Sequence, residues 1–465
     1  MKSLPGFDKW DVTRRRRLFA DHLVTPPRLF GGSFAFLVLL GTLGLKCLPG
    51  LYTGAPLNWL DALFTSTSAV CVTGLIVVDT ATYFTTAGQA WLLLLIQLGG
   101  LGMIAFSSII IIALGRRLSL RQEALATDLR AAAPHVDMRR LTFDVLRFTF
   151  LLEAAGAMLL FVLWFPRLGW RGAIWPAVFH SVSAFCNAGF STFSDSLVGF
   201  QRSPASLAVF MLLIIAGGLG FLTLEELYLR YQARRRKEAF RVSLHSRLVV
   251  WTTLGLIVAG WVLFWVFEAG RTLEHLPTGH KASNALFMSV TARTAGFNSI
   301  DYSQASNSAN FLTIILMMIG GSPVSTAGGI KTTTFALIGL LAWSRFVGYE
   351  TTMFAGRSIR KETTERAVGL FVIAFGLVTV GIFMLTATER SEGRFLAQMF
   401  EVTSAFNTVG LSMGETASLT PAGKALVIGL MFFGRVGPLT LAAAIAIQQY
   451  GRSSFRYAYE DVVVG

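Results

Sequence analysis

Four short, half-polar segments recur in a chain that is otherwise strongly apolar, and they constrain the fold more than any other feature. Each has a Phe, then a run rich in Ser and Thr with an Ala, and then a Gly followed by Leu or Phe. The segments are DALFTSTSAVCVTGL (61–75), AVFHSVSAFCNAGF (177–190), NALFMSVTARTAGF (284–297) and QMFEVTSAFNTVGL (398–411). Each is too short and too polar to cross a bilayer alone, and each lies between segments that can cross one. We therefore expect a fourfold pseudo-repeat built around a central axis.

The composition indicates an integral membrane protein. Of the 465 residues, 53% are hydrophobic and 14% are charged, and the mean hydropathy is +0.59. The net charge of +14 comes mainly from Lys and Arg in the termini and in loops that we place inside, as the positive-inside rule requires. Binding of nucleic acid is excluded because no loop is long enough to form an extramembrane domain.

The order of apolar segments predicts an all-α polytopic membrane protein. Each repeat is a span, a reentrant pore loop and a second span, and the four repeats surround one central pore in a pseudo-fourfold arrangement. The predicted repeats are 29–114, 142–229, 247–343 and 366–448, with tails at 1–28 and 451–465. The predicted spans are 29–48, 89–114, 142–165, 205–229, 247–268, 310–343, 366–388 and 422–448. All pore loops enter from the outer face, so both tails are cytoplasmic.

Pore loops of this kind suit the coordination of cations. A helix that ends inside the membrane directs its partial negative C-terminal charge at the centre. The loop after it can point carbonyl oxygens inward in place of an ion's water shell. Glycine is needed where the backbone takes a positive φ or where four loops crowd one axis. The glycines at these positions are Gly74, Gly189, Gly296 and Gly410.

The second span of the third repeat differs from its counterparts. Residues 310–343 are too long for one crossing, and the sequence GGSPVSTAGGIKTTT at 320–334 interrupts them with Gly pairs and Pro323. We expect a loop held inside the membrane here, whereas the corresponding spans continue as helices. Arg435 lies at the matching depth in the fourth repeat and can donate to carbonyls that the loop leaves free. Lys331 would either add positive charge below the pore or anchor the following helix.

The motifs resemble those of a known family. VCVTGL, FCNAGF, ARTAGF and FNTVGL are similar to the four filter signatures of the KtrB/TrkH potassium transporters. GGIKTTT and GRVGPLTL resemble the second helices of that family's third and fourth repeats. The chain lacks the additional N-terminal helix pair associated with TrkH, so the resemblance is to the KtrB branch. It implies a potassium-translocating pore subunit of a Ktr/Trk-type uptake system, with a loop of the third repeat obstructing the path below the filter.

The resemblance also assigns roles to particular residues. Potassium would bind to backbone carbonyls of the filter segments, formed by Val72, Thr73, Gly74, Asn187, Ala188, Gly189, Thr294, Ala295, Gly296, Thr408, Val409 and Gly410. The gate would be residues 320–331 with the arginine that faces them: Gly320, Gly321, Ser322, Pro323, Ser325, Thr326, Gly328, Gly329, Lys331 and Arg435. The third segment is one residue shorter, which leaves its register open, and we expect its Arg293 to point away and bind carbonyls or a carboxylate.

The partners implied by the resemblance are a second copy of the chain and a cytosolic ring. The ring would be a nucleotide-binding RCK-type assembly like KtrA, and the homodimer would lie in the lipid of a bacterial plasma (inner) membrane. The transported ion would be K+, with Na+ as an activator or a coupled ion, and no organic cofactor is expected on this chain. The sequence leaves open whether sodium drives transport.

Two other functions were weighed against the pore. An alternating-access secondary transporter of cations predicts charged binding residues at midplane and broken helices in paired positions, but only one span is visibly broken in the sequence. An intramembrane enzyme would need a nucleophile with a base or a metal cluster, and neither pattern is present, so the chain is not predicted to be an enzyme. Glu153 could be an ion relay or pair with a buried donor; Glu401 could attract cations or be a solvated residue of the outer mouth. His180 is expected to be packed.

Overall fold

The computed structural model describes residues 26–114, 138–389 and 393–437. Most of the predicted tail 1–28, much of the basic loop between Arg116 and Arg140, residues 438–448 of the last span and the tail 451–465 lie outside these residues. Nearly all described elements are α-helices, which confirms the helical class predicted from the sequence. The structure differs from the predicted all-α class in one short antiparallel hairpin, formed by β1 (Met353–Phe354) and β2 (Arg357–Ser358).

The helices follow the expected order of spans and pore helices. In the first half they are α2 (Pro26–Cys47), α3 (Trp59–Val70), α4 (Thr80–Tyr83), α5 (Thr86–Leu114), α7 (Met138–Cys186), η1 (Val198–Phe200), α8 (Pro204–Gly218) and α9 (Phe221–Arg235). In the second half they are α10 (Leu244–Glu268), α11 (Thr278–Thr291), α12 (Asn307–Met318), α13 (Thr332–Phe346), α14 (Lys361–Glu389), α15 (Phe395–Phe406), η2 (Thr416–Ser418) and α16 (Pro421–Val436). The long α7 is two helices in one, because Gly169 inside it has φ 70° and ψ 174°.

Four described helices are long and apolar enough to cross a membrane, and each begins one of the predicted repeats. The apolar stretches are Phe30–Cys47 in α2, Phe143–Cys186 in α7, Leu244–Glu268 in α10 and Lys361–Glu389 in α14. The second helix of the first repeat, α5, is 29 residues long, whereas those of the other repeats are shorter or bent. Helices α8 and α9 would together make a fifth span, but they are bent by 103°.

The prediction that only the third repeat has a broken second span is therefore wrong. Residues 205–229 do not form one helix, because Gly220 has φ 84° and ψ 137° and the helix axis changes direction there. Helix α16 likewise ends at Val436, followed by Gly437 with φ 88°. Glycine adopts these conformations without the Cβ clash that other residues suffer, so it can end a helix inside a packed interior. The number of broken spans thus no longer distinguishes a pore from alternating access.

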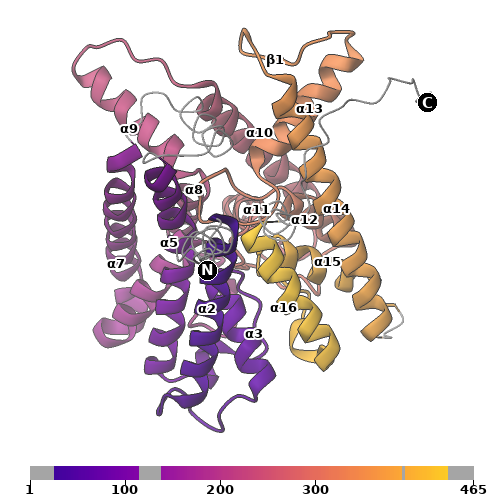
Figure 1. Cartoon of the computed structure of the whole chain (residues 1–465). Helices are drawn as coiled ribbons and strands as arrows, with labels where there is room; N and C mark the ends of the chain where they lie inside the picture. The colour runs from indigo at the N-terminus through magenta and orange to yellow at the C-terminus, as the bar shows by residue number, and fades with distance from the viewer. Residues whose placement is uncertain (1–25, 115–137, 390–392, 438–465) are drawn as a thin grey trace, which may run out of the picture.

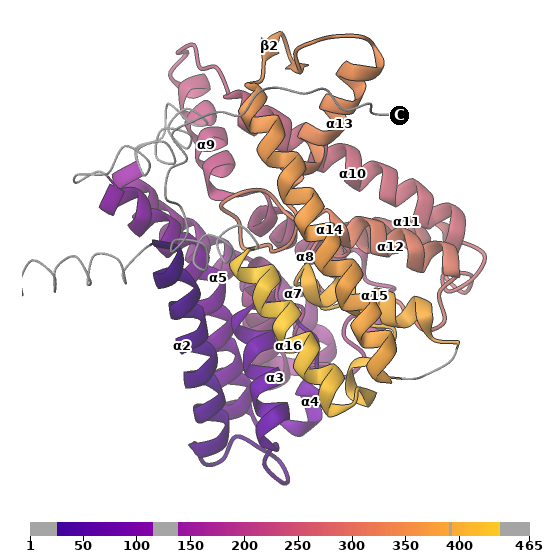
Figure 2. The same cartoon turned by 45° about the vertical axis from the view of Figure 1, so that its right-hand side comes forward.

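Helices α8, α11 and α12 lie between α7 on one side and α14 on the other (Figure 1), and α8 stays near the middle in the turned view (Figure 2). Helix α9, β1 and the end of α13 lie at one end of the molecule, and the loop between α2 and α3 lies at the other. The last repeat packs against the first, since α16 contacts α3 and Lys424 Nζ donates to Asp61 Oδ1 at 2.7 Å. The chain therefore closes into a ring of repeats rather than extending as a row.

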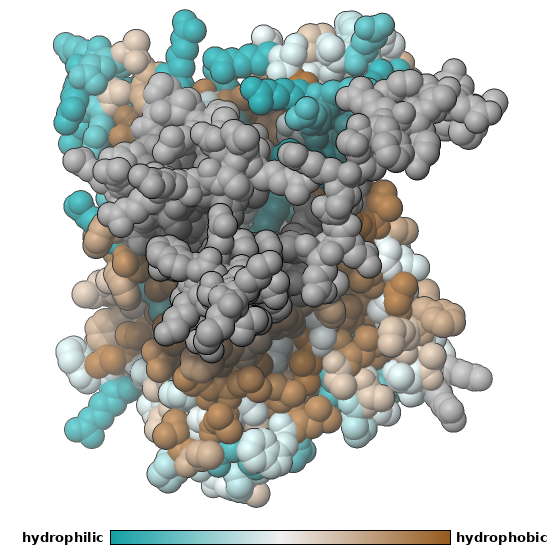
Figure 3. Space-filling view, viewed as in Figure 1, coloured by the Kyte–Doolittle hydropathy of each residue, from teal (hydrophilic) through white to brown (hydrophobic). Residues whose placement is uncertain are grey.

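The surface is apolar around the middle and polar at the end that carries α9. Figure 3 shows hydrophobic residues over the lower part of this face and hydrophilic residues along the upper edge. Large apolar side chains on the long helices are exposed, for example Phe383 at 77% and Val266 at 67%. By contrast, Ser and Thr side chains of α3, α11 and α15 are buried. Apolar residues outside and polar residues inside are the distribution expected for a protein solvated by lipid.

Candidate functional site

The four pore helices end in loops with the same backbone conformation. Two residues before each loop glycine, a non-glycine residue has a positive φ: Val72 (56°), Asn187 (60°), Thr294 (68°) and Thr408 (50°). The glycines follow with φ of 94° at Gly74, 71° at Gly189, 80° at Gly296 and 92° at Gly410. Left-handed conformations are uncommon for branched residues, and here they recur at four equivalent positions. Backbone strain repeated in this way indicates a functional site.

The four loop glycines meet one another in a closed ring. A Cβ atom added to Gly74 would lie 3.1 Å from Cα of Gly189, and one added to Gly189 would lie 2.9 Å from Cα of Gly296. A Cβ on Gly296 would lie 3.3 Å from Cα of Gly410, and one on Gly410 would lie 3.0 Å from Cα of Gly74. The loops are therefore arranged in the order of the chain, with the first beside the last.

Carbonyl oxygens lie in the same ring. The Cβ added to each glycine would also contact the carbonyl oxygen of the residue that precedes the next glycine. These oxygens belong to Thr73, Ala188, Ala295 and Val409. Any side chain at a loop glycine would therefore displace an oxygen of the neighbouring loop. The absence of a side chain lets four backbones approach closely enough to present oxygens to one small volume.

Hydrogen bonds from the pore helices hold the loops in register. The backbone N–H groups of Thr73, Ala188 and Val409 donate to carbonyls five residues earlier, on Ser68, Ser183 and Ser404. In the third loop Ala295 donates to Thr291, four residues earlier, at 3.0 Å. The third loop is therefore one residue shorter in the turn directly after its pore helix. The backbone conformations of Thr294 and Gly296 match those of the equivalent residues in the other loops.

An open cavity of about 340 Å³ lies on one side of the glycine ring. All four loop glycines line it, together with the residues that follow them, among which are Ile76, Ser191, Asn298 and Ser412. Asp79 and Asp301 also line the cavity and bring carboxylates to it. A cavity with acidic side chains raises the local concentration of cations next to the carbonyl ring.

The non-helical residues between α12 and α13 lie against the inner ends of two pore helices. Thr326 Oγ1 is 3.3 Å from the carbonyl of Phe185 and accepts from Asn187 Nδ2 at 3.2 Å. A Cβ on Gly328 would contact the Thr408 side chain, and one on Gly329 would lie 3.0 Å from Cβ of Asn407. The segment therefore lies next to the second and fourth filter loops, across from the open cavity.

The bend between α8 and α9 supplies the partners that this segment needs. Ser322 N donates to Gly218 O at 2.9 Å, and Thr326 N donates to Gly217 O at 3.2 Å. In return, Phe221 N donates to Val324 O at 2.9 Å. Sequence reasoning missed this arrangement, although the run Gly217–Gly218–Leu219–Gly220 marked the place where the helix could end. Two broken helices thus satisfy each other's backbone groups inside the membrane.

Three cations, the buried Arg435 and Arg293 and the half-buried Lys331, lie in or beside the segment and donate to carbonyls. Arg435 is 1% exposed and donates through Nη1 to Thr326 O and through Nη2 to Gly99 O, the latter at 2.9 Å. Lys331 Nζ donates to Ala327 O at 2.7 Å. Arg293 Nη2 lies 3.4 Å from Gly320 O, so this arginine turns toward a carbonyl, as expected. Lys331 is thus bonded within the segment that precedes its helix.

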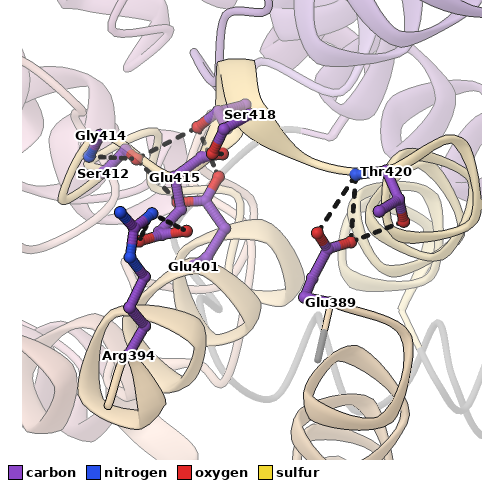
Figure 4. Close-up of polar contacts among 9 residues, drawn as sticks. Glu389, Arg394, Glu401, Ser412, Gly414, Glu415, Ser418 and Thr420 are labelled. Atoms are coloured by element: carbon purple, nitrogen blue, oxygen red, sulfur yellow. Dashed lines mark hydrogen bonds and ion pairs between the residues drawn. The ribbon is translucent and has the colours of Figure 1, made fainter. Parts of the chain in front are cut away.

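Two carboxylates near the filter have partners that the sequence left undecided. Glu153 accepts from Gln97 Nε2 at 3.1 Å and lies 3.9 Å from the Cys186 thiol, which agrees with pairing to a buried donor. Glu401 is fully buried, so the expectation of a solvated residue at the outer mouth is wrong. Its carboxylate accepts from Ser412 Oγ at 2.7 Å and Thr416 Oγ1 at 2.5 Å, under the turn after the fourth filter loop (Figure 4).

Comparisons with known proteins identify the family. The family model described as "TrkH: Cation transport protein" matches residues 40–457. The Ktr system potassium uptake protein B of Vibrio alginolyticus is 39% identical over 94% of this chain and 95% of its own length. The potassium/sodium uptake protein NtpJ of Enterococcus hirae is 36% identical over 95% of this chain and 98% of its own length.

A solved structure agrees with the fold. The potassium transporter TrkH from Vibrio parahaemolyticus has a TM-score of 0.67 and 20% sequence identity, covering 89% of this chain and 82% of that one. The resemblance inferred from the loop motifs is confirmed, and the family comprises transporters, not enzymes. The chain belongs to the TrkH/KtrB family of cation transport proteins.

Proposed function

We propose that this chain is the potassium-translocating pore subunit of a Ktr/Trk-type uptake system. The observation that carries the proposal is the closed ring of Gly74, Gly189, Gly296 and Gly410, each against a carbonyl of the next loop. Carbonyl oxygens that converge on one point can replace the hydration shell of a monovalent cation. Relatives with more than a third of their residues identical over nearly the full length are named as potassium uptake proteins.

The four pore helices add a field that favours cations at the ring. The helices α3, α11 and α15, and the last part of α7, all end a few residues before a loop glycine. Their C-terminal ends carry partial negative charge, which the low dielectric of the interior leaves poorly screened. An ion would enter from the cavity, pass the carbonyls of the filter segments and meet residues 320–331.

Residues 320–331 are proposed to be the gate. They lie beside Asn187 and Asn407 at the inner ends of two filter loops, which supports a position across the ion path. Thr326 is held from two sides, by Gly217 O at 3.1 Å and by Arg435. Such contacts are individually worth about 1 to 3 kcal/mol, so a few of them can hold a closed state that a partner still releases.

Potassium uptake by a transport-deficient bacterial strain tests the pore. Cells that express the chain should grow at low external K+ and accumulate K+ in preference to Na+, because the carbonyl ring replaces the hydration shell of the larger ion. Purified protein in liposomes should conduct K+ down its gradient without a second substrate. Absence of K+ flux in cells and in liposomes, both with the unmodified chain and with a chain that lacks the proposed gate residues 324–329, with folded protein in the membrane, contradicts the proposal.

The assembly is proposed to be a homodimer in a bacterial plasma membrane, bound to a cytosolic nucleotide-binding RCK-type ring. Relatives belong to a "Ktr system", which supports a regulatory partner. Both tails and the basic end of α9 are proposed to be cytoplasmic. The end of α9 carries Arg234, Arg235, Arg236 and Lys237, which are all exposed. This cluster either contacts the ring or only sets the topology.

Charge reversal distinguishes these two roles. Replacing Arg234, Arg235, Arg236 and Lys237 by Glu should reduce co-purification with the ring protein several-fold, because like charges then face the partner. Insertion into the membrane and the elution volume of the purified protein serve as controls. Reversal at the exposed Arg357 in β2 and Arg360 before α14 provides a smaller change of charge, two residues instead of four, elsewhere on the same end. If co-purification persists at its original level, the contact lies elsewhere.

A further inference from the structure

Residues of the pore helices differ in how they support the outer turns of the four loops. The backbone bonds to Ser68, Ser183, Thr291 and Ser404 fix the equivalence of the four pore helices. Three residues before each of these lie Thr65, His180, Met288 and Glu401. Two residues after each loop glycine lie Ile76, Ser191, Asn298 and Ser412, which line the cavity. In the second and fourth repeats, the side chain on the pore helix is hydrogen-bonded to the side chain after the loop glycine.

The second repeat has a histidine at this position. His180 is fully buried, with Nδ1 2.8 Å from Pro176 O and Nε2 2.9 Å from Ser191 Oγ. The nitrogen near a carbonyl donates, so in the neutral ring Nε2 accepts from the serine hydroxyl. Ser191 Oγ in turn accepts from Phe193 N at 3.0 Å. The histidine thus holds the serine that closes the turn.

The fourth repeat makes the same connection with a carboxylate. Glu401 accepts from Ser412 Oγ at 2.7 Å, and Ser412 Oγ accepts from Gly414 N at 3.0 Å (Figure 4). The two side chains differ in chemistry, but the distance in sequence to the serine and the turn that the serine forms are the same. Thr416 adds a second donor to the carboxylate at 2.5 Å.

The first and third repeats have no such connection. Thr65 Oγ1 has no hydrogen-bond partner among the residues that the structure describes, and its counterpart across the loop is Ile76. Met288 cannot accept a strong hydrogen bond, and Asn298 instead donates to Ile300 O at 3.0 Å. In the glycine ring the second and fourth loops are diagonally opposite, because each adjoins the first and the third. The loops that have this side-chain connection therefore alternate with the loops that lack it.

We propose that His180 and Glu401 are positioning residues of the filter, which hold two opposite outer turns through Ser191 and Ser412 and thereby set the affinity for the incoming cation. The inference rests on the proposed potassium pore. A turn that is fixed before the ion arrives need not be ordered when the ion binds, so binding is tighter. Loss of one support frees the turn and misplaces carbonyls only a few residues away.

The test compares Ser191→Ala and Ser412→Ala with Thr65→Val. Each serine variant should raise the KM for K+ uptake about fivefold, the equivalent of one ordinary hydrogen bond, with the maximal rate per folded molecule retained. The double variant should raise it about 25-fold, because the two serines share no hydrogen-bond partner and their effects should add. Thr65→Val removes a hydroxyl without a described partner at the equivalent position and should leave KM unchanged. A loss of folded protein alone would lower the maximal rate and leave KM as it was.

The outcomes separate this inference from the proposed function. If the unmodified chain does not transport K+, the pore proposal fails and the inference falls with it. If the unmodified chain transports K+ and both serine variants keep their KM within about twofold, the inference alone is overturned. Should a serine variant not fold, His180→Gln and Glu401→Gln change the same contacts at nearly constant volume. An unchanged KM in the variants that fold then overturns the inference equally.

Discussion

Replacing any one of the four loop glycines by Ser should reduce the preference for K+ over Na+ by about tenfold or more, which corresponds to about 1.4 kcal/mol of discrimination. Two effects add. An L-residue with a left-handed φ, such as 92° at Gly410, is strained by about 1 to 2 kcal/mol. A Cβ there would also contact Thr73 O and lie 3.0 Å from Cα of Gly74, so the neighbouring loop must move. The measurement is the ratio of uptake affinities for the two ions in cells.

A glycine on the same face of the protein serves as the control. Gly279 is the second residue of α11, and a Cβ added to it would meet nothing within 4 Å. Gly279→Ser should therefore keep the ratio of the unmodified chain. Each of the four loop variants must be present in the membrane as folded protein before its ratio is compared. Ratios that stay unchanged in all four variants would exclude these loops as the selectivity filter.

Removing residues 324–329 should raise K+ flux through purified protein in liposomes by about tenfold, and Arg435→Ala should act in the same direction. Arg435 donates to Thr326 O, and the deletion removes that carbonyl together with the contacts of Thr326 to Gly217 and Asn187. Loss of about 1.4 kcal/mol from the closed state is enough for a tenfold shift of the population. Control of flux by the regulatory ring should weaken in both variants.

Selectivity distinguishes this change from damage to the filter. The gate variants should keep the K+/Na+ ratio, because the loop glycines and their carbonyl neighbours are untouched, whereas the glycine variants should lose the ratio. Arg435→Lys keeps one charged donor and should give an intermediate flux. Arg435→Ala leaves Thr326 O and Gly99 O without this donor, at a cost of about 1 to 3 kcal/mol each, so folding is checked by gel filtration. Folded variants with unaltered or lower flux would show that residues 320–331 are not the gate.

Much of the candidate site could be predicted from local sequence. The loop glycines could be predicted because a positive φ is a property of one residue and its immediate neighbours. Glycine is the residue that adopts this conformation at low cost, so its presence marks each turn separately. The interruption after α12 was visible for a similar reason, since Pro323 and the glycine pairs oppose helix formation wherever they occur. Arg435 was conspicuous because a charge in an apolar segment needs a partner.

Other features depended on contacts between distant residues. Arg435 bonds to Gly99, 336 positions away, and no local pattern specifies that carbonyl as its acceptor. The sequence predicts that the helix continues through Gly220, because glycine is compatible with both a close helix contact and a helix end. The helix ends there because residues 322–326 form hydrogen bonds with the backbone groups that the bend leaves without helical partners. The burial of Glu401 could not be predicted, because no local sequence pattern distinguishes a buried carboxylate on a pore helix from an exposed one.

The sequence alone determined where each of the four loops turns and which repeat carries the internal loop, since glycine and proline limit the backbone at their own positions. The tertiary structure alone decided which carbonyl faces which glycine. It also decided that buried His180 and Glu401 support two opposite turns. The physical reason is that hydrogen bonds and van der Waals contacts act over a few ångströms of space, whatever the distance along the chain.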